Sequence, residues 1–267
     1  MRRSSPLALR VVALVYLTFL LVLPVGLVFW RTFQHGAGPV VDALTRPAVL
    51  HAFRVTAVVA AWTVALNTVF GVGVALLIVR GRFPGRRALD AAVDLPLAVS
   101  PVVVGLALIL VYGRFEPIGG WLETHGLQII FAVPGMVLAT VFVSLPLVVR
   151  EVAPVLAEIG TEQEQAAWTL GAGPVQTFRR ITLPAIRWAL AYGMVLTLAR
   201  ALGEFGAVAV VSGRLVGRTQ TATLVVDQSF QNFDQPTAYA VSVALASVAI
   251  VVLVVVNILR SREQSRA

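Results

Sequence analysis

The sequence lacks two residue types on which many enzymes depend. It contains no cysteine, which excludes disulfides, thiolate metal sites and cysteine nucleophiles. It also contains no lysine, so all 21 of its basic residues are arginine. The phosphate-binding loop of nucleotide hydrolases requires a lysine, and so does a retinal Schiff base. We therefore expect a chain that is not itself an enzyme, without an ATP-hydrolysis site, a metal or a cofactor.

Charged residues are also scarce. They make up 13% of the 267 residues, whereas 58% are hydrophobic and the mean hydropathy is +0.87. A soluble domain is usually about half apolar and about a quarter charged. The net charge of +8 would suggest nucleic acid as the partner of a soluble protein. In so apolar a chain the arginines instead fit membrane orientation, so we expect membrane lipid as a partner and no nucleic acid.

Six apolar runs predict an all-α, polytopic membrane protein with six transmembrane helices. A helix of about 20 apolar residues crosses a hydrocarbon core of about 30 Å. The first run is long for a signal peptide and lacks a clear cleavage site, so it should be retained. The predicted spans, which together form one domain over 1–267, are 7–29, 51–79, 89–111, 129–149, 185–211 and 238–259.

The distribution of arginine predicts the orientation of these spans. If the N-terminus is cytoplasmic, fourteen arginines fall in inner loops and six in outer loops, and Arg200 lies within the fifth span. Loops rich in arginine remain on the cytoplasmic side. Both termini and the polar loop at 150–187 should therefore face the cytoplasm.

The loop at 150–187 has the pattern of two short helices joined by a tight corner. Thr161, followed three residues later by Glu164, resembles a capping box that begins the first helix. Gly171 suits the left-handed residue that ends it, and Pro174 suits the first turn of the second. The residues alone indicate either a docking surface for another protein or a loop that folds back on the membrane.

This loop resembles the EAA loop of bacterial ABC importer permeases. The family pattern reads Glu-Ala-Ala, three residues, glycine, nine residues and Ile-x-Leu-Pro. Six residues match it: Ala166, Ala167, Gly171, Ile181, Leu183 and Pro184. The glutamate position holds Gln165, so an ion pair made there is weakened or shifts to Glu164. The resemblance implies that these eight residues couple the chain to a separate ATPase. Leu183 precedes a proline, which favours an extended backbone at that residue.

The fifth and third predicted spans contain polar residues. Arg200 and Glu204, at i and i+4, can partly neutralise each other. A charge at the bilayer centre costs about 2.5–3.5 kcal/mol on insertion scales, so both should face protein or water. They indicate either a structural pair or an arginine on the path of an anion. Ser100, before Pro101, interrupts the third span, either as a packing kink or as the lining of a cavity.

Two further stretches resemble permeases for tetrahedral oxyanions, especially those of the sulfate/thiosulfate type. They are LARALGEFGAVAVVSG at 198–213 and the sequence at 80–108, and the resemblance covers about 53–260. It implies a type I ABC importer transmembrane domain in a bacterial inner membrane. Its partners would be a second homologous permease, an ATPase dimer and an extracytoplasmic sulfate-binding protein.

The same resemblance makes Arg200, Glu204 and Ser100 candidates for the translocation pathway. A molybdate/tungstate permease is the nearest alternative. A stand-alone secondary transporter is less well supported, because that class usually has internal repeats and we find none in this sequence.

Overall fold

The fold is a bundle of long helices, seen here in a computed structural model that describes residues 6–264. No strand occurs within that range. Residues 1–5 and 265–267, at the termini predicted to be cytoplasmic, lie outside the described residues. Five helical segments are long and apolar enough to cross a membrane. They are Arg10–Phe33 (in α1, Pro6–Leu17, η1, Thr18–Val22, and α2, Leu23–Phe33), α4 (Pro47–Arg80), α8 (Val133–Glu158), Pro174–Leu202 and Gln235–Val252 in α14 (Gln235–Gln264).

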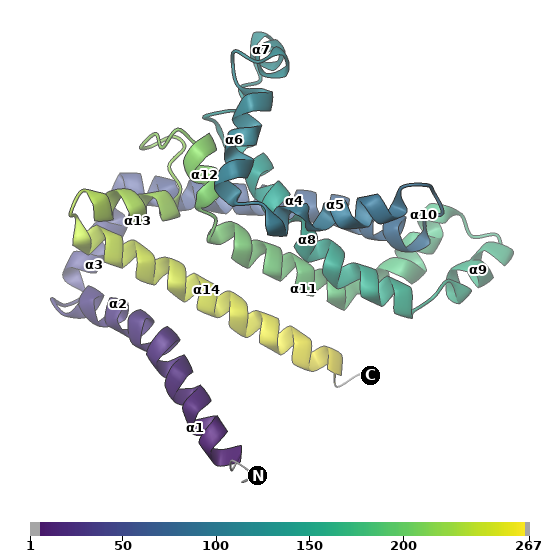
Figure 1. The fold of residues 1–267 in the computed structure, drawn as a ribbon, viewed down its shortest axis with the longest axis horizontal. Coiled ribbons are helices and arrows are strands. Elements are labelled where there is room, and N and C mark those ends of the chain that lie inside the picture. The colour runs from purple at the N-terminus through teal and green to yellow at the C-terminus, as the bar shows by residue number, and fades with distance from the viewer. Residues whose placement is uncertain (1–5, 265–267) are drawn as a thin grey trace, which may run out of the picture.

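A sixth span results if two helices joined by a bend count as one. α5 (Arg86–Ala98) and α6 (Pro101–Tyr112) meet at 112°, and α6 stands away from the bundle (Figure 1). The interruption predicted at Ser100 within the span 89–111 is therefore confirmed, and it separates two helices. Ser100 is extended, with ψ at 133°, because the residue before a proline avoids the helical region. Pro101 then begins a new helix.

The fifth predicted span, 185–211, is also interrupted. α11 (Leu183–Leu202) ends at Gly203, and the short helix α12 (Gly206–Val211) follows after a break. Arg200 is thus in the last turn of α11, where a positive charge suits the helix dipole. Glu204 lies beyond the end of that helix. The expectation that both residues lie in one continuous helix is wrong.

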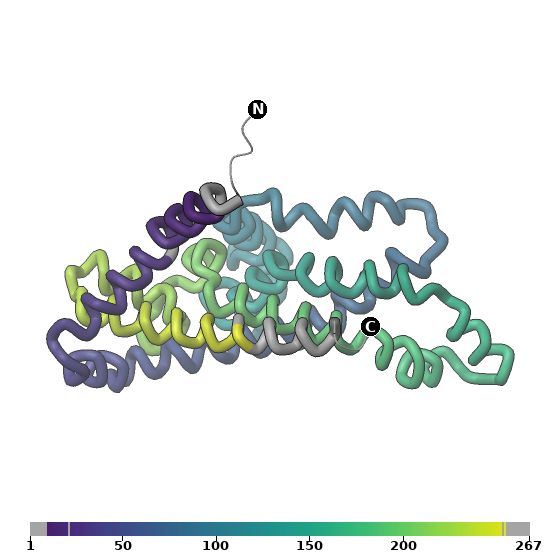
Figure 2. The backbone as a smooth tube through the Cα atoms, turned by 90° about the horizontal axis from the view of Figure 1, so that it is seen from below, coloured from purple at the N-terminus to yellow at the C-terminus, as the bar shows by residue number. Residues whose placement is uncertain are grey.

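The centre of the bundle is formed by α4, α8 and α11, which run side by side (Figures 1 and 2). Two glycines allow the close approach. A Cβ on Gly71 would lie 2.7 Å from Val148 Cγ1, and one on Gly193 would lie 3.1 Å from Val148 Cα. Small residues at helix contacts are typical of membrane bundles. The packing around Val148 therefore fixes how the three helices lie against one another.

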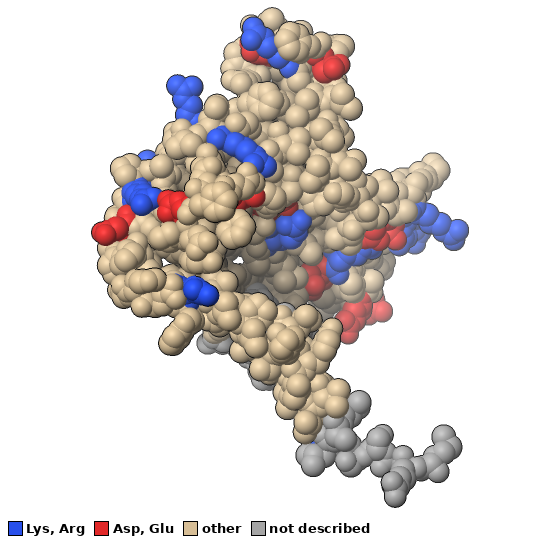
Figure 3. All heavy atoms as spheres, turned by 60° about the vertical axis from the view of Figure 1, so that its left-hand side comes forward, with Lys and Arg blue, Asp and Glu red and all other residues tan. Residues whose placement is uncertain are grey.

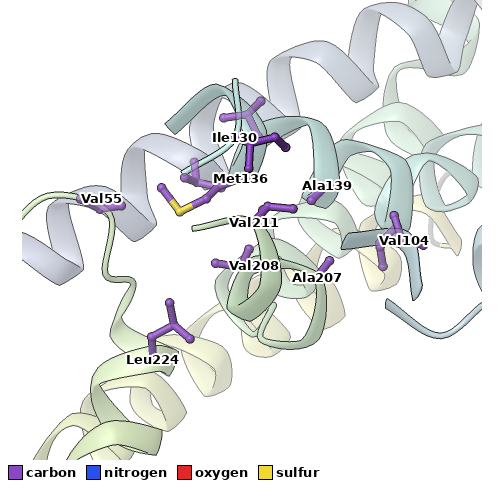
Figure 4. Close-up of a cluster of buried hydrophobic side chains, with 12 residues drawn as sticks. Val55, Val104, Ile130, Met136, Ala139, Ala207, Val208, Val211 and Leu224 are labelled. Carbon is purple, nitrogen blue, oxygen red and sulfur yellow. The ribbon is translucent and has the colours of Figure 1, made fainter. Parts of the chain in front are cut away.

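A second cluster of buried side chains lies where α6 and α12 meet the bundle (Figure 4). It draws on five helices, including α13 (Ala222–Gln231). Its labelled members are Val55, Val104, Ile130, Met136, Ala139, Ala207, Val208, Val211 and Leu224. This cluster attaches the base of the bent α6 arm to the rest of the protein. Charged side chains are sparse over much of the face shown in Figure 3, as expected of a surface in contact with lipid.

Ion pairs attach α5, the first helix of the bent pair, to α8. The guanidinium of Arg150 on α8 contacts two carboxylates on α5, with Nη1 at 2.7 Å from Asp90 Oδ1 and Nη2 at 2.6 Å from Asp94 Oδ2. One arginine thus binds two successive turns of α5 and holds that helix against α8.

Short helices lie at the two ends of the bundle (Figure 1). One end carries α3 (Gly38–Thr45) and α13, and the opposite end carries α9 (Glu162–Thr169) and α10 (Pro174–Thr177). The tip of α6 carries α7 (Pro117–Thr124). The residues predicted to contact an ATPase therefore lie at the opposite end of the bundle from α3 and α13.

An ion pair joins two segments at the α3 end. Arg46 Nη1 lies 2.8 Å from Asp234 Oδ2 and donates a hydrogen bond of 2.8 Å to Thr237 Oγ1. Burial raises the pKa of Asp234, but hydrogen bonds from Thr237 and Arg46 outweigh burial and hold that pKa below its ordinary value. The contact attaches the start of α14 to the start of α4.

Candidate functional site

The corner between α9 and α10 is a Schellman motif. Gly171 has φ of +85°, which a glycine adopts at little cost. The N–H of Ala172 donates to the carbonyl of Ala167 at 3.0 Å, and the N–H of Gly171 donates to that of Trp168 at 3.0 Å. These bonds satisfy carbonyls that the end of a helix leaves free. The predicted role of Gly171 in the backbone is confirmed.

Glu164 holds this corner to the spans. Its side chain is buried, and its Oε2 lies 3.2 Å from Nε of Arg80, the last residue of α4. Its Oε1 accepts a hydrogen bond of 2.8 Å from Thr182 Oγ1, directly before α11. Arg80 also donates to the carbonyl of Gly160. We call Arg80, Glu164 and Thr182 the clamp, because they join α9 to the ends of α4 and α11.

The predicted capping box does not form. Thr161 is the residue before α9, but its side chain caps no helical N–H. Its Oγ1 instead accepts a hydrogen bond of 3.0 Å from Gln165 Nε2. Glu164, which should have closed the box, is engaged in the clamp. Of the two neighbouring residues, Glu164 therefore makes the ion pair, and the exposed Gln165 makes only a local contact.

Leu183 is helical, with φ of −62° and ψ of −44°, so the expected extended conformation is wrong. A π-helical turn, η2 (Phe178–Thr182), directly precedes it. Such a wider turn occurs where a helix departs from regular hydrogen bonding, and here it lets the chain run into Pro184 without ending. The second helix is consequently continuous with α11.

The residues of the EAA-like pattern divide into two groups. Ile181 and Leu183 are partly buried at the base of α11 and anchor the loop. Gln165, Ala166 and Gly171 are exposed on the outer side of the corner, as is Pro184 at its base, and Ala167 is half-buried.

Large apolar side chains surround that exposed corner. Leu170 is 88% exposed, and Trp168 and Val175 are also exposed. Apart from its chain neighbours, no described residue has an atom within 4 Å of a Cβ built on Gly171. Apolar side chains around a flat, small-residue surface favour contact with another protein.

The two broken spans contact each other. A Cβ on Gly206, at the start of α12, would lie 3.1 Å from Pro101 Cβ at the start of α6. One turn further along α6, a Cβ on Gly105 would lie 2.8 Å from Val210 Cβ. Glycines on both helices thus bring the breaks together. Ser100, in one of the breaks, is exposed.

Arg200 and Glu204 form an ion pair at the second break. Arg200 Nη1 lies 2.6 Å from Glu204 Oε2, and the side chains are 37% and 1% exposed, respectively. Glu204 Oε1 also accepts a hydrogen bond of 2.9 Å from the N–H of Ala207 in α12. Thr223 on α13 donates to the Glu204 carbonyl at 2.9 Å. Glu204 is fixed on three sides, whereas Arg200 has no second ion-pair partner among the described residues.

The sequence did not indicate Arg80 or Thr182. Arg80 looked like one of several arginines at the end of a span, and Thr182 occupies the variable position of Ile-x-Leu-Pro. Only the fold brings these two residues to Glu164.

Comparison with known proteins decides the family. Residues 67–264 match the family described as "binding-protein-dependent transport system inner membrane component". The chain belongs to this family of transport permeases. Its members are membrane components of a larger system, in agreement with a multi-pass transport subunit that works with the other subunits of an ABC transporter.

Proteins of similar sequence indicate the type of permease that the chain resembles. The chain is 49% identical to the sulfate transport system permease protein CysW of Synechocystis sp. over 250 residues, which cover 94% of this chain and 91% of that protein. It is 45% identical to CysW of Escherichia coli (strain K12) over 248 residues, which cover 93% and 85%. The predicted resemblance to ABC importer permeases of the sulfate type is confirmed.

Solved structures show the same fold. A bacterial ABC transporter that imports alginate has a chain 18% identical to this one, with a TM-score of 0.78 over 96% of this chain and 94% of that one. The MetNI methionine ABC transporter has a chain 20% identical, with a TM-score of 0.59 over 84% and 98%. The predicted fold class, an all-α transmembrane domain of an ABC importer, is confirmed.

Proposed function

We propose that this chain is a membrane-spanning permease subunit of an ATP-driven sulfate/thiosulfate importer. It lies in the bacterial inner membrane with both termini in the cytoplasm. It pairs with a second homologous permease, and an ATPase dimer and an extracytoplasmic sulfate-binding protein complete the assembly. The identity of 45–49% with sulfate permeases is the observation that carries the choice of substrate.

The corner between α9 and α10 is the proposed docking surface for the ATPase. Leu170, Trp168 and Val175 project from it, while Ala166 and Gly171 leave room for a partner to approach. Apolar anchors surrounded by a polar rim are the usual source of binding energy at protein interfaces. No lysine is present, so ATP hydrolysis is assigned to the partner.

The clamp is the proposed mechanical link. Because Glu164 contacts both Arg80 and Thr182, a displacement of the corner acts on α4 and α11 together. α11 runs without interruption from Leu183 to Leu202. Arg200 lies in its last turn, so one rigid helix joins the docking surface to the charged break.

Arg200 is the proposed contact for the anion in the pathway. Its guanidinium has five N–H donors in a planar fork, which suits a tetrahedral oxyanion, and it is partly exposed. Glu204 neutralises part of its charge and orients it. A transported ion must also leave, so a partly neutralised arginine is better suited than a free one.

Growth of cells that lack their own sulfate permeases tests this function. Expression of this chain with the second permease, the ATPase and the binding protein should restore growth on sulfate. Excess thiosulfate should compete for uptake of radiolabelled sulfate. Competition by molybdate or tungstate alone, with no sulfate uptake, would instead identify the alternative oxyanion. Uptake that persists without any ATPase subunit would indicate a secondary transporter.

A further inference from the structure

The core of α4, α8 and α11 contains a compact set of fully buried polar side chains. Thr63 and Asn67 lie on α4, Thr140 and Ser144 on α8, and Thr197 on α11, and each is 0% exposed. Asn67 Nδ2 donates a hydrogen bond of 2.8 Å to Ser144 Oγ. A polar group in an apolar interior requires a hydrogen-bond partner, so each atom of this set must find one.

Three of these atoms have no partner among the residues that the structure describes. They are Thr63 Oγ1, Asn67 Oδ1 and Thr197 Oγ1. Helical hydroxyls commonly bond to the carbonyl four residues earlier. Nine hydroxyls among the described residues do so: Thr32, Thr45, Thr56, Thr68, Thr140, Ser144, Thr177, Ser242 and Ser247. Thr63 and Thr197 differ, since each is fully buried and makes no bond to its own helix.

The packing around Val148 places the three helices in register. Gly71 on α4 and Gly193 on α11 both lie against Val148 on α8, so these residues share one level of the bundle. α4 and α8 both end at the α9 end of the bundle, where α11 begins (Figure 1). One turn away from that end is therefore four residues earlier on α4 and α8, and four residues later on α11.

One turn away from Gly71, Val148 and Gly193, the three helices carry Asn67, Ser144 and Thr197, respectively. One helical turn rises about 5.4 Å and returns to nearly the same face. The hydrogen bond between Asn67 and Ser144 agrees with this register. Thr197 then faces the same layer from α11, and Thr63 lies one turn from Asn67 on its own face. By this register, the three residues that carry the unpaired atoms lie within about one helical turn of one another, on α4 and α11.

We propose that these three atoms bind one internal water molecule. Two hydroxyls can donate to the water oxygen, and the water can donate to Asn67 Oδ1, which has no proton of its own. A buried water typically makes about three hydrogen bonds to groups of this kind. The water fixes α11 against α4 at one register. The inference concerns the core and does not depend on the transported substrate.

A density map of the purified transporter, at a resolution that shows ordered water, tests the proposal on the unmodified chain. We expect one peak within hydrogen-bond distance of Thr63 Oγ1, Asn67 Oδ1 and Thr197 Oγ1. A map with no peak there, or with both hydroxyls bonded directly to Asn67 or to carbonyls of their own helices, would overturn it.

A double-mutant cycle provides a second, independent measurement. Thr63→Val and Thr197→Val keep the side-chain shape, and each should lower the folding equilibrium constant of the full chain in detergent by roughly tenfold, because it leaves other groups unpaired. The double variant should lose little more than either single variant, since both changes empty the same site.

The matched control pairs Thr197→Val with Thr68→Val, because the Thr68 hydroxyl is bonded to Val64 on its own helix. These two effects should multiply. If the losses in folding equilibrium constant also multiply for Thr63→Val with Thr197→Val, or if neither change has an effect, the two hydroxyls share no ligand.

Discussion

Replacing Glu164 by glutamine removes one charge from the clamp and leaves its shape nearly unchanged. The side chains of Arg80 and Glu164 are only 19% and 10% exposed, so their pairing is poorly screened by solvent. Breaking a fully buried ion pair costs about 3–5 kcal/mol. Arg80 retains the Gly160 carbonyl, and glutamine can still accept from Thr182. We therefore expect a smaller loss of about 2 kcal/mol.

A loss of about 2 kcal/mol lowers the population of the correctly held corner relative to the released one by about 30-fold. When only the held corner docks, the binding-competent fraction falls by the same factor if the released corner predominates in the variant, and by less if the held corner still does. The assay is co-purification of the ATPase with the variant permease, followed by ATP hydrolysis and sulfate uptake in vesicles. Membrane insertion should be normal, because the change lies at the end of the bundle.

The matched control is Gln165→Ala, one residue further along the same helix. Gln165 is exposed and bonds only to Thr161, so its loss should change stability by about 0.5 kcal/mol or less. Wild-type coupling in Glu164→Gln together with lost coupling in Gln165→Ala would refute the assignment of the clamp and return the role to the family's usual glutamate position.

Four other changes have defined outcomes. Gly171→Val forces a β-branched residue to a φ of +85°, which costs about 1–3 kcal/mol and should abolish ATPase binding and uptake without affecting insertion; normal uptake would contradict the docking surface. Arg200→Ala strands the buried Glu204 carboxylate and should cost less than the roughly 3–5 kcal/mol of a fully buried pair, because Arg200 is 37% exposed. The double change of both residues to neutral ones should assemble and fail only in transport; normal transport would exclude a pathway role. Because the pKa of Asp234 is lowered in the folded chain, its stabilisation is complete above the unfolded-state pKa and is lost as pH falls through the folded-state pKa, so Asp234→Asn should flatten the acid limb of a thermal-stability profile; an unchanged limb would contradict this. A reporter protein that works only in the cytoplasm should be active when fused to the C-terminus, and one that works only in the periplasm should be inactive there. A periplasmic signal would contradict the six-span topology.

The local backbone conformation could be predicted from the sequence where a single residue type determines it. Gly171 was identified correctly because a positive φ next to a helix end favours glycine regardless of the rest of the fold. The apolar runs located the spans, because hydrophobic length limits how a helix can lie in a bilayer; among the described residues the structure has five, or six if the bent pair of α5 and α6 counts as one.

The contacts of the clamp could not be predicted in the same way. Glu164 and Arg80 are 84 residues apart, and nothing in the local pattern of either one indicates the other. The capping box failed for this reason: a long-range ion pair competed successfully for the carboxylate of Glu164.

The breaks at Ser100 and Gly203 were hidden by hydropathy. Both lie inside apolar runs, and a hydropathy pattern does not distinguish a straight span from a bent one. Pro101 marked the position of the first break, but the 112° bend depends on the packing of α6 against α12. The placement of Glu204 beyond α11 follows from the same packing.

ATP-driven uptake by the purified assembly in sealed vesicles tests the central claim most directly. The chain is reconstituted with its second permease and the ATPase, with the binding protein and radiolabelled sulfate on the outer side and ATP inside. We predict sulfate accumulation that requires both ATP and the binding protein and that disappears with Gly171→Val. Accumulation that is independent of ATP, or an assembly that hydrolyses ATP in response to loaded binding protein yet moves no sulfate, would contradict the account.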